Sequence, residues 1–202
     1  MTAPRRGVAY PRFAGVAGGC ATTTLTTALA GIDAHVYRGK GRVDVLVCRP
    51  TMSSLSEAQV ALAAMPYRPV LAVVADVPRA VSSAARARLR LTEPHTAEVV
   101  HVPFVPELRQ LDQAHVQAEV AAWWSEDRPR WLREFAEAMT ELRDAVLPLL
   151  ETDLAAAQLA AQPAQAPAPA PSQAPALASA WRQIPPPAAA VPGPPAPLGR
   201  GR

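Results

Sequence analysis

The sequence has few of the features that mark secreted or membrane-spanning proteins. It contains only two cysteines, Cys20 and Cys48, which is too few for a secreted disulfide scaffold. No apolar run approaches the roughly 18 residues that cross a bilayer, and no apolar segment of a secretory signal follows the first residues. We therefore expect a soluble, cytoplasmic protein with no membrane span.

The chain also lacks the concentrated positive charge of a nucleic-acid-binding protein. Its formal net charge is +3, but Arg182, Arg200 and Arg202 all follow the last acidic residue, Asp153. Residues 1–155 carry 17 basic and 17 acidic groups and are electroneutral. Binding to a phosphate backbone requires a basic surface, so the charge pattern argues against a nucleic-acid partner.

Proline divides the chain into two parts. About half of the 23 prolines lie from Pro163 onward, in a Pro/Ala/Gln segment with almost no branched aliphatic residues. We predict an α/β domain over residues 1–155 and a disordered Pro/Ala-rich tail over residues 156–202. The segment around Trp181, residues 177–187, is either a motif that docks on a protein partner or part of a semi-rigid spacer.

Hydrophobic periodicity predicts alternating strands and helices. Short apolar runs predict strands over residues 7–14, 43–48, 69–75 and 98–102. Residues 31–42 are expected to form a loop, with room for one short edge strand. Helical spacing predicts helices over residues 22–30, 53–65, 79–91, 107–123 and 130–150, the last two forming C-terminal helices over 107–151. Strands and helices that alternate with short connections predict a three-layer fold with a parallel sheet.

Local signals refine the helix ends. Ser54 has the capping-box spacing to Glu57, and Asp127 with Pro129 marks the start of the last helix. Pro148 is expected to end or kink that helix. The apolar stripe of helix 130–150 either packs on the sheet or forms a surface for a protein partner or a second copy of this chain.

A glycine-rich segment, residues 14–25, has the layout of a phosphate-binding loop. A short strand, a Gly-Gly turn and a threonine run place backbone N–H groups around an anion. A working loop of this kind has a lysine directly before the Ser/Thr that binds magnesium, and here that position is Thr22. The turns after the other strands, 49–53, 76–79 and 103–107, should lie at the same edge of the sheet, where ligands bind in such folds.

These segments resemble the ParA/MinD branch of the P-loop NTPases. In that branch the loop is Lys-Gly-Gly-x-Gly-Lys-Thr-Thr, and a later strand is Asp-x-x-x-x-Asp-x-Pro. Residues 17–24 fall on the loop, residues 44–50 fall on the strand, and residues 102–104 are similar to the segment after the last core strand. The degenerate loop and Pro-rich tail are also similar to uncharacterised actinobacterial proteins.

The resemblance implies a P-loop NTPase-like fold and a nucleotide site. The residues that it places around ATP are Gly18, Gly19, Cys20, Ala21, Thr22, Thr23 and Thr24, with Thr23 also on magnesium. The departures lie at the chemistry: Thr22 replaces the phosphate lysine, Ala17 the branch's additional lysine, and Arg49 the carboxylate that holds magnesium water. The chain therefore resembles a degenerate Walker A protein that has lost efficient hydrolysis, and no catalytic residue is assigned.

Two function classes remain open. The first is a pseudo-ATPase that acts as a nucleotide-binding or nucleotide-free adaptor in a positioning or assembly system. The second is an active ATPase or GTPase that uses Arg49, or a residue donated by a partner, in place of the lysine. A surface arginine at a strand end is the simpler interpretation of Arg49.

Three other sets of residues have competing interpretations. Cys20 and Cys48 should lie at one edge of the sheet, either as a reactive pair or as buried bystanders. The four histidines show no metal-ligand spacing, which favours structural or solvated roles over metal binding: His35, His95, His101 and His115. Asp76 follows a buried strand, where it could recognise a base or cap the next helix.

Overall fold

The centre of the protein is one sheet of five parallel strands. A computed structural model describes residues 10–78 and 81–161. The strands are β1 (Arg12–Gly15), β2 (Ile32–Val36), β3 (Val45–Cys48), β4 (Val70–Val74) and β5 (Val99–Val102), in the order β2-β1-β3-β4-β5. The chain steps outward from β1 to β2 and returns to the other side of β1 for β3. The winding therefore reverses between β1 and β3, and the expected parallel sheet is confirmed.

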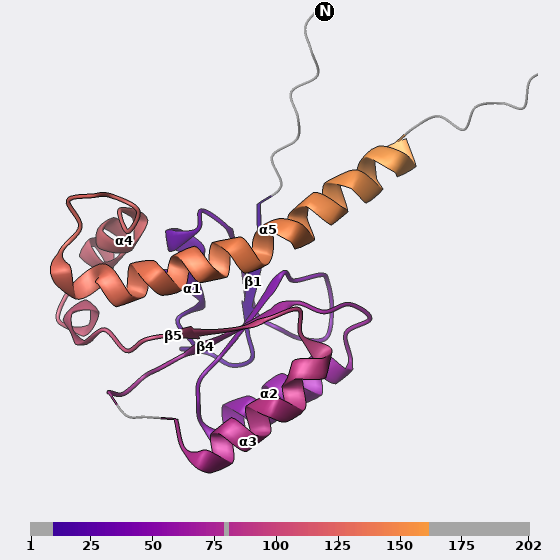
Figure 1. Ribbon diagram of the computed structural model, residues 1–202, viewed down its shortest axis with the longest axis horizontal. Helices are drawn as coiled ribbons and strands as arrows, with labels where there is room; N and C mark the ends of the chain where they lie inside the picture. The colour runs from indigo at the N-terminus through magenta and orange to yellow at the C-terminus, as the bar shows by residue number, and fades with distance from the viewer. Residues whose placement is uncertain (1–9, 79–80, 162–202) are drawn as a thin grey trace, which may run out of the picture. The chain divides into compact units, whose positions relative to one another are not determined.

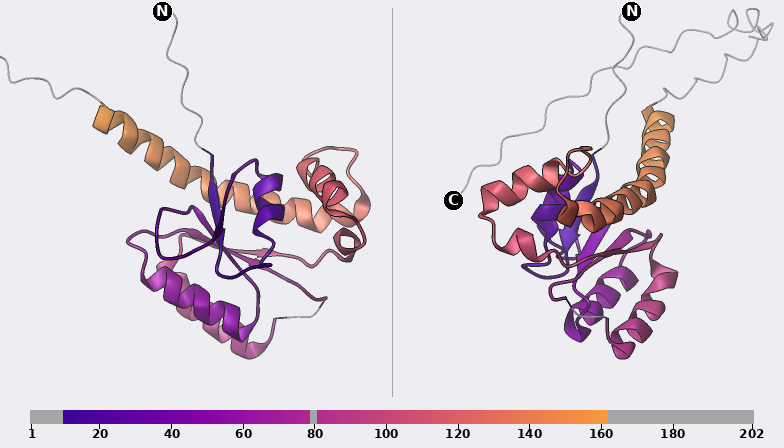
Figure 2. Two further views of the ribbon diagram at one scale, coloured as in Figure 1. Left: turned by 180° about the vertical axis from the view of Figure 1, so that it is seen from behind. Right: turned by 60° about the vertical axis from the view of Figure 1, so that its left-hand side comes forward.

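Helices cover both faces of the sheet and give the expected three layers (Figure 1). One face carries α1 (Thr22–Ala28) and α5 (Arg133–Ala161), with α4 (Gln113–Ala121) packed against α1. The other face carries α2 (Met52–Ala63) and α3 (Ser83–Thr92), as Figure 2 shows from two further sides. Short 3₁₀ turns are η1 (Glu93–His95), η2 (Pro106–Arg109) and η3 (Arg130–Leu132). No helix in the described part of the chain is long and apolar enough to cross a membrane.

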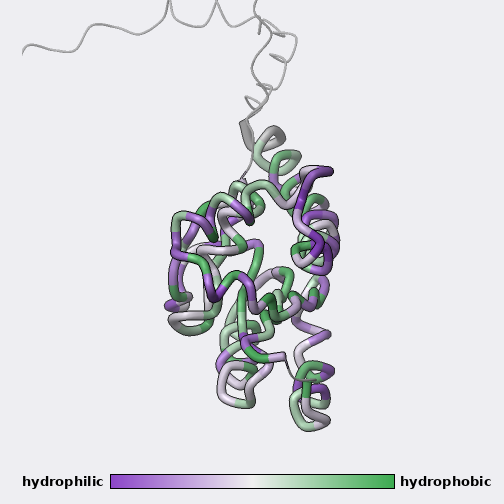
Figure 3. The backbone as a smooth tube through the Cα atoms, turned by 90° about the vertical axis from the view of Figure 1, so that its left-hand side faces the viewer, coloured by the Kyte–Doolittle hydropathy of each residue, from purple (hydrophilic) through white to green (hydrophobic). Residues whose placement is uncertain are grey.

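The central strands are apolar along their whole length because both of their faces are buried. All four residues of β3 are buried, and they alternate between the two hydrophobic clusters that flank the sheet. The helices instead alternate between hydrophilic and hydrophobic residues along the tube of Figure 3. This difference explains why periodicity separated the strands from the helices.

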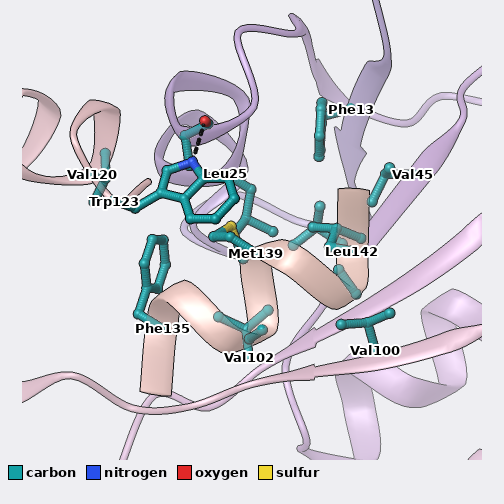
Figure 4. Packing of buried hydrophobic residues seen from close by; sticks show 14 of the residues in the cluster. Phe13, Leu25, Val45, Val100, Val102, Val120, Trp123, Phe135, Met139 and Leu142 are labelled. Carbon is teal, nitrogen blue, oxygen red and sulfur yellow. Dashed lines mark hydrogen bonds between the residues drawn. The ribbon is translucent and has the colours of Figure 1, made fainter. Parts of the chain in front are cut away.

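The largest cluster lies between the sheet and α5. Leu132, Phe135, Met139, Leu142 and Val146 are all buried there. Figure 4 shows Phe135, Met139 and Leu142 among them. The apolar stripe of helix 130–150 therefore packs on the sheet, as one of the two interpretations proposed. Figure 4 also shows the indole of Trp123, whose Nε1–H donates to the carbonyl of Ala28 at 2.7 Å and ties the segment after α4 to the end of α1.

The edge strand expected within residues 31–42 is confirmed as β2, which is irregular. Its pairing with β1 shifts register between Phe13 and Gly15, and His35 has a φ of 58°. On the other side, β1 begins later than predicted. Pro11 lies just before the strand, so its missing N–H removes no donor from the ladder. Its carbonyl accepts from the N–H of Ile32 at 2.8 Å. Residues 7–9 of the predicted strand lie outside the described residues.

Several predicted helix starts are wrong. The helix predicted from residue 79 is α3, which begins at Ser83 because the Ser82 side chain caps it by accepting from the N–H of Ala85. The cap of α2 is Thr51, whose side chain accepts from the N–H of Ser54, while the Ser54 hydroxyl accepts from the N–H of Arg49 at 2.9 Å. The predicted helix 107–123 is two elements, η2 and α4, because the Asp112 side chain caps a new helix by accepting from the N–H of His115.

The prediction that Asp127 caps the last helix is also wrong, since α5 begins at Arg133 after η3. Of the two outcomes expected at Pro148, an end of the helix is wrong, because α5 continues to Ala161, and the helix instead changes direction along its length (Figure 1). The partly buried residues Leu149 and Leu150 still pack against the core after the proline, so tertiary contacts hold the helix there. An ion pair of 2.6 Å between Arg42 and Asp153 adds a further tie. Trp181 and its segment lie outside the described residues.

The Trp123 hydrogen bond leads to a stability prediction. Trp123→Phe leaves the buried carbonyl of Ala28 without its indole donor, and we expect the free energy of unfolding to fall by about 1–3 kcal/mol. The control is Trp124→Phe, because Trp124 is 73% exposed and its substitution should cost no more than about 0.5 kcal/mol. Urea unfolding measures both variants, and equal losses would contradict the assignment.

Candidate functional site

The loop after β1 is tightly packed around Gly15. A Cβ at Gly15 would lie 2.7 Å from the Thr22 hydroxyl oxygen and 2.8 Å from the carbonyl oxygen of Ala17, so this position requires glycine. Gly19 has a φ of 73°, and Ala21 adopts the left-handed region with a φ of 64°. The loop therefore has a compact backbone with two residues in the left-handed region, one of them the non-glycine Ala21.

Thr22 faces inward. Its side chain lies against Gly15, and the residue is 9% exposed. The resemblance gives this position to a lysine that extends toward phosphate. In this protein the same position packs under the loop and presents no charge.

Thr23 points toward β2. Its hydroxyl donates to Oδ2 of Asp33 at 2.8 Å, and Oδ1 of Asp33 accepts from the N–H of His35 at 2.7 Å. The Asp33 side chain is 20% exposed. The sequence analysis gave Asp33 no role, although an aspartate shortly after a threonine-bearing loop was a usable signal.

Thr23 and Asp33 border a cavity of about 260 Å³, which we call the loop cavity. Its lining residues are Ala17, Gly18, Gly19, Ala21, Thr22, Thr23, Asp33, His35 and Val36. No lysine or arginine of the described chain lines it. Asp33 is thus its one carboxylate, and the cavity offers backbone and hydroxyl groups but no permanent cation.

Arg49 lies on the other side of the loop. Because β1 pairs directly with β3, the residue after β3 comes beside the loop after β1. The Arg49 guanidinium donates through Nε and Nη2 to the carbonyl of Gly19, and Nη1 lies 3.8 Å from Oδ2 of Asp76. Arg49 therefore reaches the loop, but what it holds there is a carbonyl and a carboxylate.

A second cavity of about 220 Å³, the edge cavity, lies at the carboxyl ends of the strands. Segments that follow β1, β3, β4 and β5 all line it, as the parallel sheet predicted. Its polar and aromatic lining includes Arg49, Asp76, Phe104 and Arg109. Four turns that are distant in the sequence thus form one site.

The structure divides the predicted nucleotide residues between these two cavities. Gly18, Thr22 and Thr23 line the loop cavity, Cys20, Thr24 and Arg49 line the edge cavity, and Gly19 and Ala21 line both. The two cavities are therefore neighbours on opposite sides of the loop.

The loop cavity offers some of the ligands that a magnesium ion needs. Magnesium prefers oxygen ligands and is held by one or two carboxylates together with substrate phosphates and water. Thr23 and Asp33 offer a hydroxyl and a carboxylate side by side. Within residues 10–78 and 81–161 no group of three or more His, Cys, Asp or Glu side chains forms a metal site, so the remaining ligands would come from a phosphate ligand and water.

Two aspartates have other surroundings than the sequence suggested. Asp76 is not a helix cap, because α3 is capped by Ser82, and it faces Arg49 instead. Asp44, the first residue of the strand motif, lies before β3 at the end remote from the loop. It is buried and accepts from the N–H of Arg12 at 2.8 Å, with Nε of Arg42 at 3.6 Å. Its contacts are structural.

The two cysteines come together as buried, free thiols. Burial raises the pKa of Cys48 to about 12, and the neighbouring Cys20 adds to the increase. A thiol in this state is not a nucleophile at neutral pH. His35, His95, His101 and His115 are exposed.

Comparison with known proteins gives no relative. No protein-family model, no curated protein and no solved structure matches this chain.

The raised pKa of Cys48 predicts a pH dependence of stability. The unfolded chain loses the thiol proton near the ordinary pKa of about 8.5, whereas the folded protein keeps it to about pH 12. The free energy of unfolding should therefore fall as pH rises from about 9 toward 12. Cys48→Ala should show a shallower fall in denaturant titrations at each pH, and identical slopes would contradict the prediction.

Proposed function

We propose that the protein is a ParA/MinD-like pseudo-ATPase, a cytoplasmic adaptor in a positioning or assembly system that binds a magnesium nucleotide weakly and does not hydrolyse it. One observation carries the proposal: the Thr23 hydroxyl and the Asp33 carboxylate meet at 2.8 Å beside a glycine loop that has no lysine. The P-loop NTPase-like fold of residues 1–155 is part of the same proposal.

The metal side of the site supports nucleotide binding. In P-loop NTPases magnesium is held by the loop Ser/Thr and an aspartate from a strand. Thr23 and Asp33 supply these two groups from the start of α1 and from β2. Magnesium would neutralise charge on the phosphates, which makes up for part of the missing lysine. The chain's own residues would orient the metal, because Asp33 is fixed by the N–H of His35.

The phosphate side of the site supports weak binding without turnover. Phosphoryl transfer depends on cations placed at the oxygens that gain charge in the transition state. Thr22 is buried beneath the loop, and Arg49 is occupied by the Gly19 carbonyl. Neither residue delivers positive charge to the loop cavity. A nucleotide could therefore be bound while its terminal phosphate remains stable.

The edge cavity provides room for a base. Ligand pockets usually measure about 300–1,000 Å³, and the edge cavity of about 220 Å³ suits a single ring system rather than a whole nucleotide. Phe104 offers an aromatic face, and Asp76 offers an acceptor for an amino group. Gly19 and Ala21 line both cavities, so a nucleotide could run across the loop from one to the other.

An adaptor also needs a surface for a partner. The face of α5 that turns away from the sheet includes Leu147, which is 45% exposed, and it borders a groove of about 440 Å³ with Tyr10 and Trp124. A protein partner or a second copy of the chain could bind helix 130–150 at this groove. The segment around Trp181 remains a second candidate for partner binding.

Calorimetry with ATP, ADP and GTP, with and without magnesium, tests the proposal. We expect weak binding that requires magnesium, with no release of phosphate. Asp33→Asn removes the carboxylate ligand and should weaken binding at least about tenfold, whereas Asp112→Asn, at the cap of α4, should leave it unchanged. A nucleotide affinity that is the same without magnesium and in Asp33→Asn would contradict the proposed site.

The alternative, an active ATPase or GTPase that uses Arg49, is favoured by the contact of Arg49 with the loop. In that role the guanidinium would have to leave Gly19 and Asp76 and bind phosphate. Arg49→Ala would then abolish turnover and weaken nucleotide binding. Under the pseudo-ATPase proposal the same variant keeps or improves affinity, because the loop loses a group that covers it. Single-turnover hydrolysis and calorimetry distinguish the two outcomes.

A further inference from the structure

Arg109 is a second cation at the site, and the sequence analysis gave it no role. It is the last residue of η2, which follows β5. Its Nη2 donates to the carbonyl of Asp76 at 2.8 Å, and its guanidinium carbon lies 5.2 Å from the centre of the Phe104 ring. These two contacts hold the guanidinium plane at the rim of the edge cavity.

Arg109 also lies close to the threonines of the loop. It lines a further cavity of about 540 Å³ together with Thr23 and Thr24, between the start of α1 and the start of α4. The same arginine lines the edge cavity with Thr24 and Arg49. Arg109 therefore lies between Thr23, the proposed magnesium ligand, and the edge cavity that Thr24 also lines.

The donors of Arg109 are less occupied than those of Arg49. Arg49 uses Nε and Nη2 on Gly19 and turns Nη1 to a carboxylate. Among the described residues, Arg109 donates one hydrogen bond, from Nη2 to Asp76, and no carboxylate of the described chain is paired with it. A guanidinium has five N–H donors, so Arg109 retains the paired donors that bind a phosphate in two places.

We propose that Arg109, and not Arg49, supplies the positive charge for a phosphate-bearing ligand at this site. The inference rests on the proposed nucleotide site and adds to it the residue that replaces the missing lysine. The ligand's anionic group would lie between Arg109 and the hydroxyls of Thr23 and Thr24, while its ring would extend toward Phe104. The charge thus comes from the turn after β5 and not from the loop.

The test compares full-length variants by calorimetry with two probes, ATP with magnesium and inorganic pyrophosphate with magnesium. Arg109→Ala should weaken the binding of both probes at least about tenfold, because a charge-assisted bidentate contact is lost. Arg109→Lys should restore part of the affinity as a point charge. The matched control is Arg90→Ala, an exposed arginine on α3 at the opposite face of the sheet, which should change nothing. Thermal unfolding checks that the variants remain folded.

Each outcome decides something different. If Arg109→Ala binds both probes like the wild type while Asp33→Asn loses ATP, the inference about Arg109 is wrong and the proposed function stands. If the wild type binds pyrophosphate but no nucleotide, and Arg109→Ala loses pyrophosphate, the inference stands and the nucleotide proposal falls. If the wild type binds neither probe, both are overturned.

Discussion

The pairing of β1 with β3 is the constraint on which the site depends. Phe13, Ala14 and Gly15 lie beside Val45, Leu46 and Val47 in a parallel ladder. Since both strands end at the same edge, the loop after β1 must lie next to the residue after β3. The winding reverses at this point, which leaves the edge uncovered by a crossover. The edge cavity and the position of Arg49 follow from this ladder, whereas the loop cavity follows from the pairing of β1 with β2 on the other side.

The polar side chains beside the loop are paired with groups of the chain itself, Arg49 on one side and Thr23 with Asp33 on the other. Arg49 donates to the carbonyl of Gly19 and faces the carboxylate of Asp76, so the chain satisfies its own donors and acceptors at the switch point. On the other side, Thr23 and Asp33 satisfy each other with a hydroxyl and a carboxylate. The contacts of Arg49 with Gly19 and Asp76 are structural, because they join the turns that follow three strands. The second brings together a hydroxyl and a carboxylate oxygen, which are ligand types that magnesium prefers, and the proposed nucleotide site rests on this pair.

Sequence patterns predicted the strands because a sheet buried on both faces requires continuous apolar runs such as Val45–Cys48. They also predicted that the turns converge at one edge, which parallel topology enforces. Asp33 was missed because β2 is a half-exposed, irregular edge strand with little apolar signal. Arg109 was missed because its place depends on a 3₁₀ turn that breaks the expected helix. Cap residues and the effect of Pro148 depended on tertiary contacts that spacing alone does not encode.

Thr22, at the position where the resemblance expects a lysine, differs from it in more than charge. Thr22 is packed against Gly15, whose lack of a side chain makes room for the threonine hydroxyl, so the backbone around position 22 is adapted to a short, neutral residue. A longer side chain there would have to leave this contact and cross the loop. The glycine-rich backbone, the oxygen pair of Thr23 and Asp33, and the arginine on η2 therefore surround one loop. In the proposed site the loop would give shape, β2 the carboxylate, and the turn after β5 the positive charge.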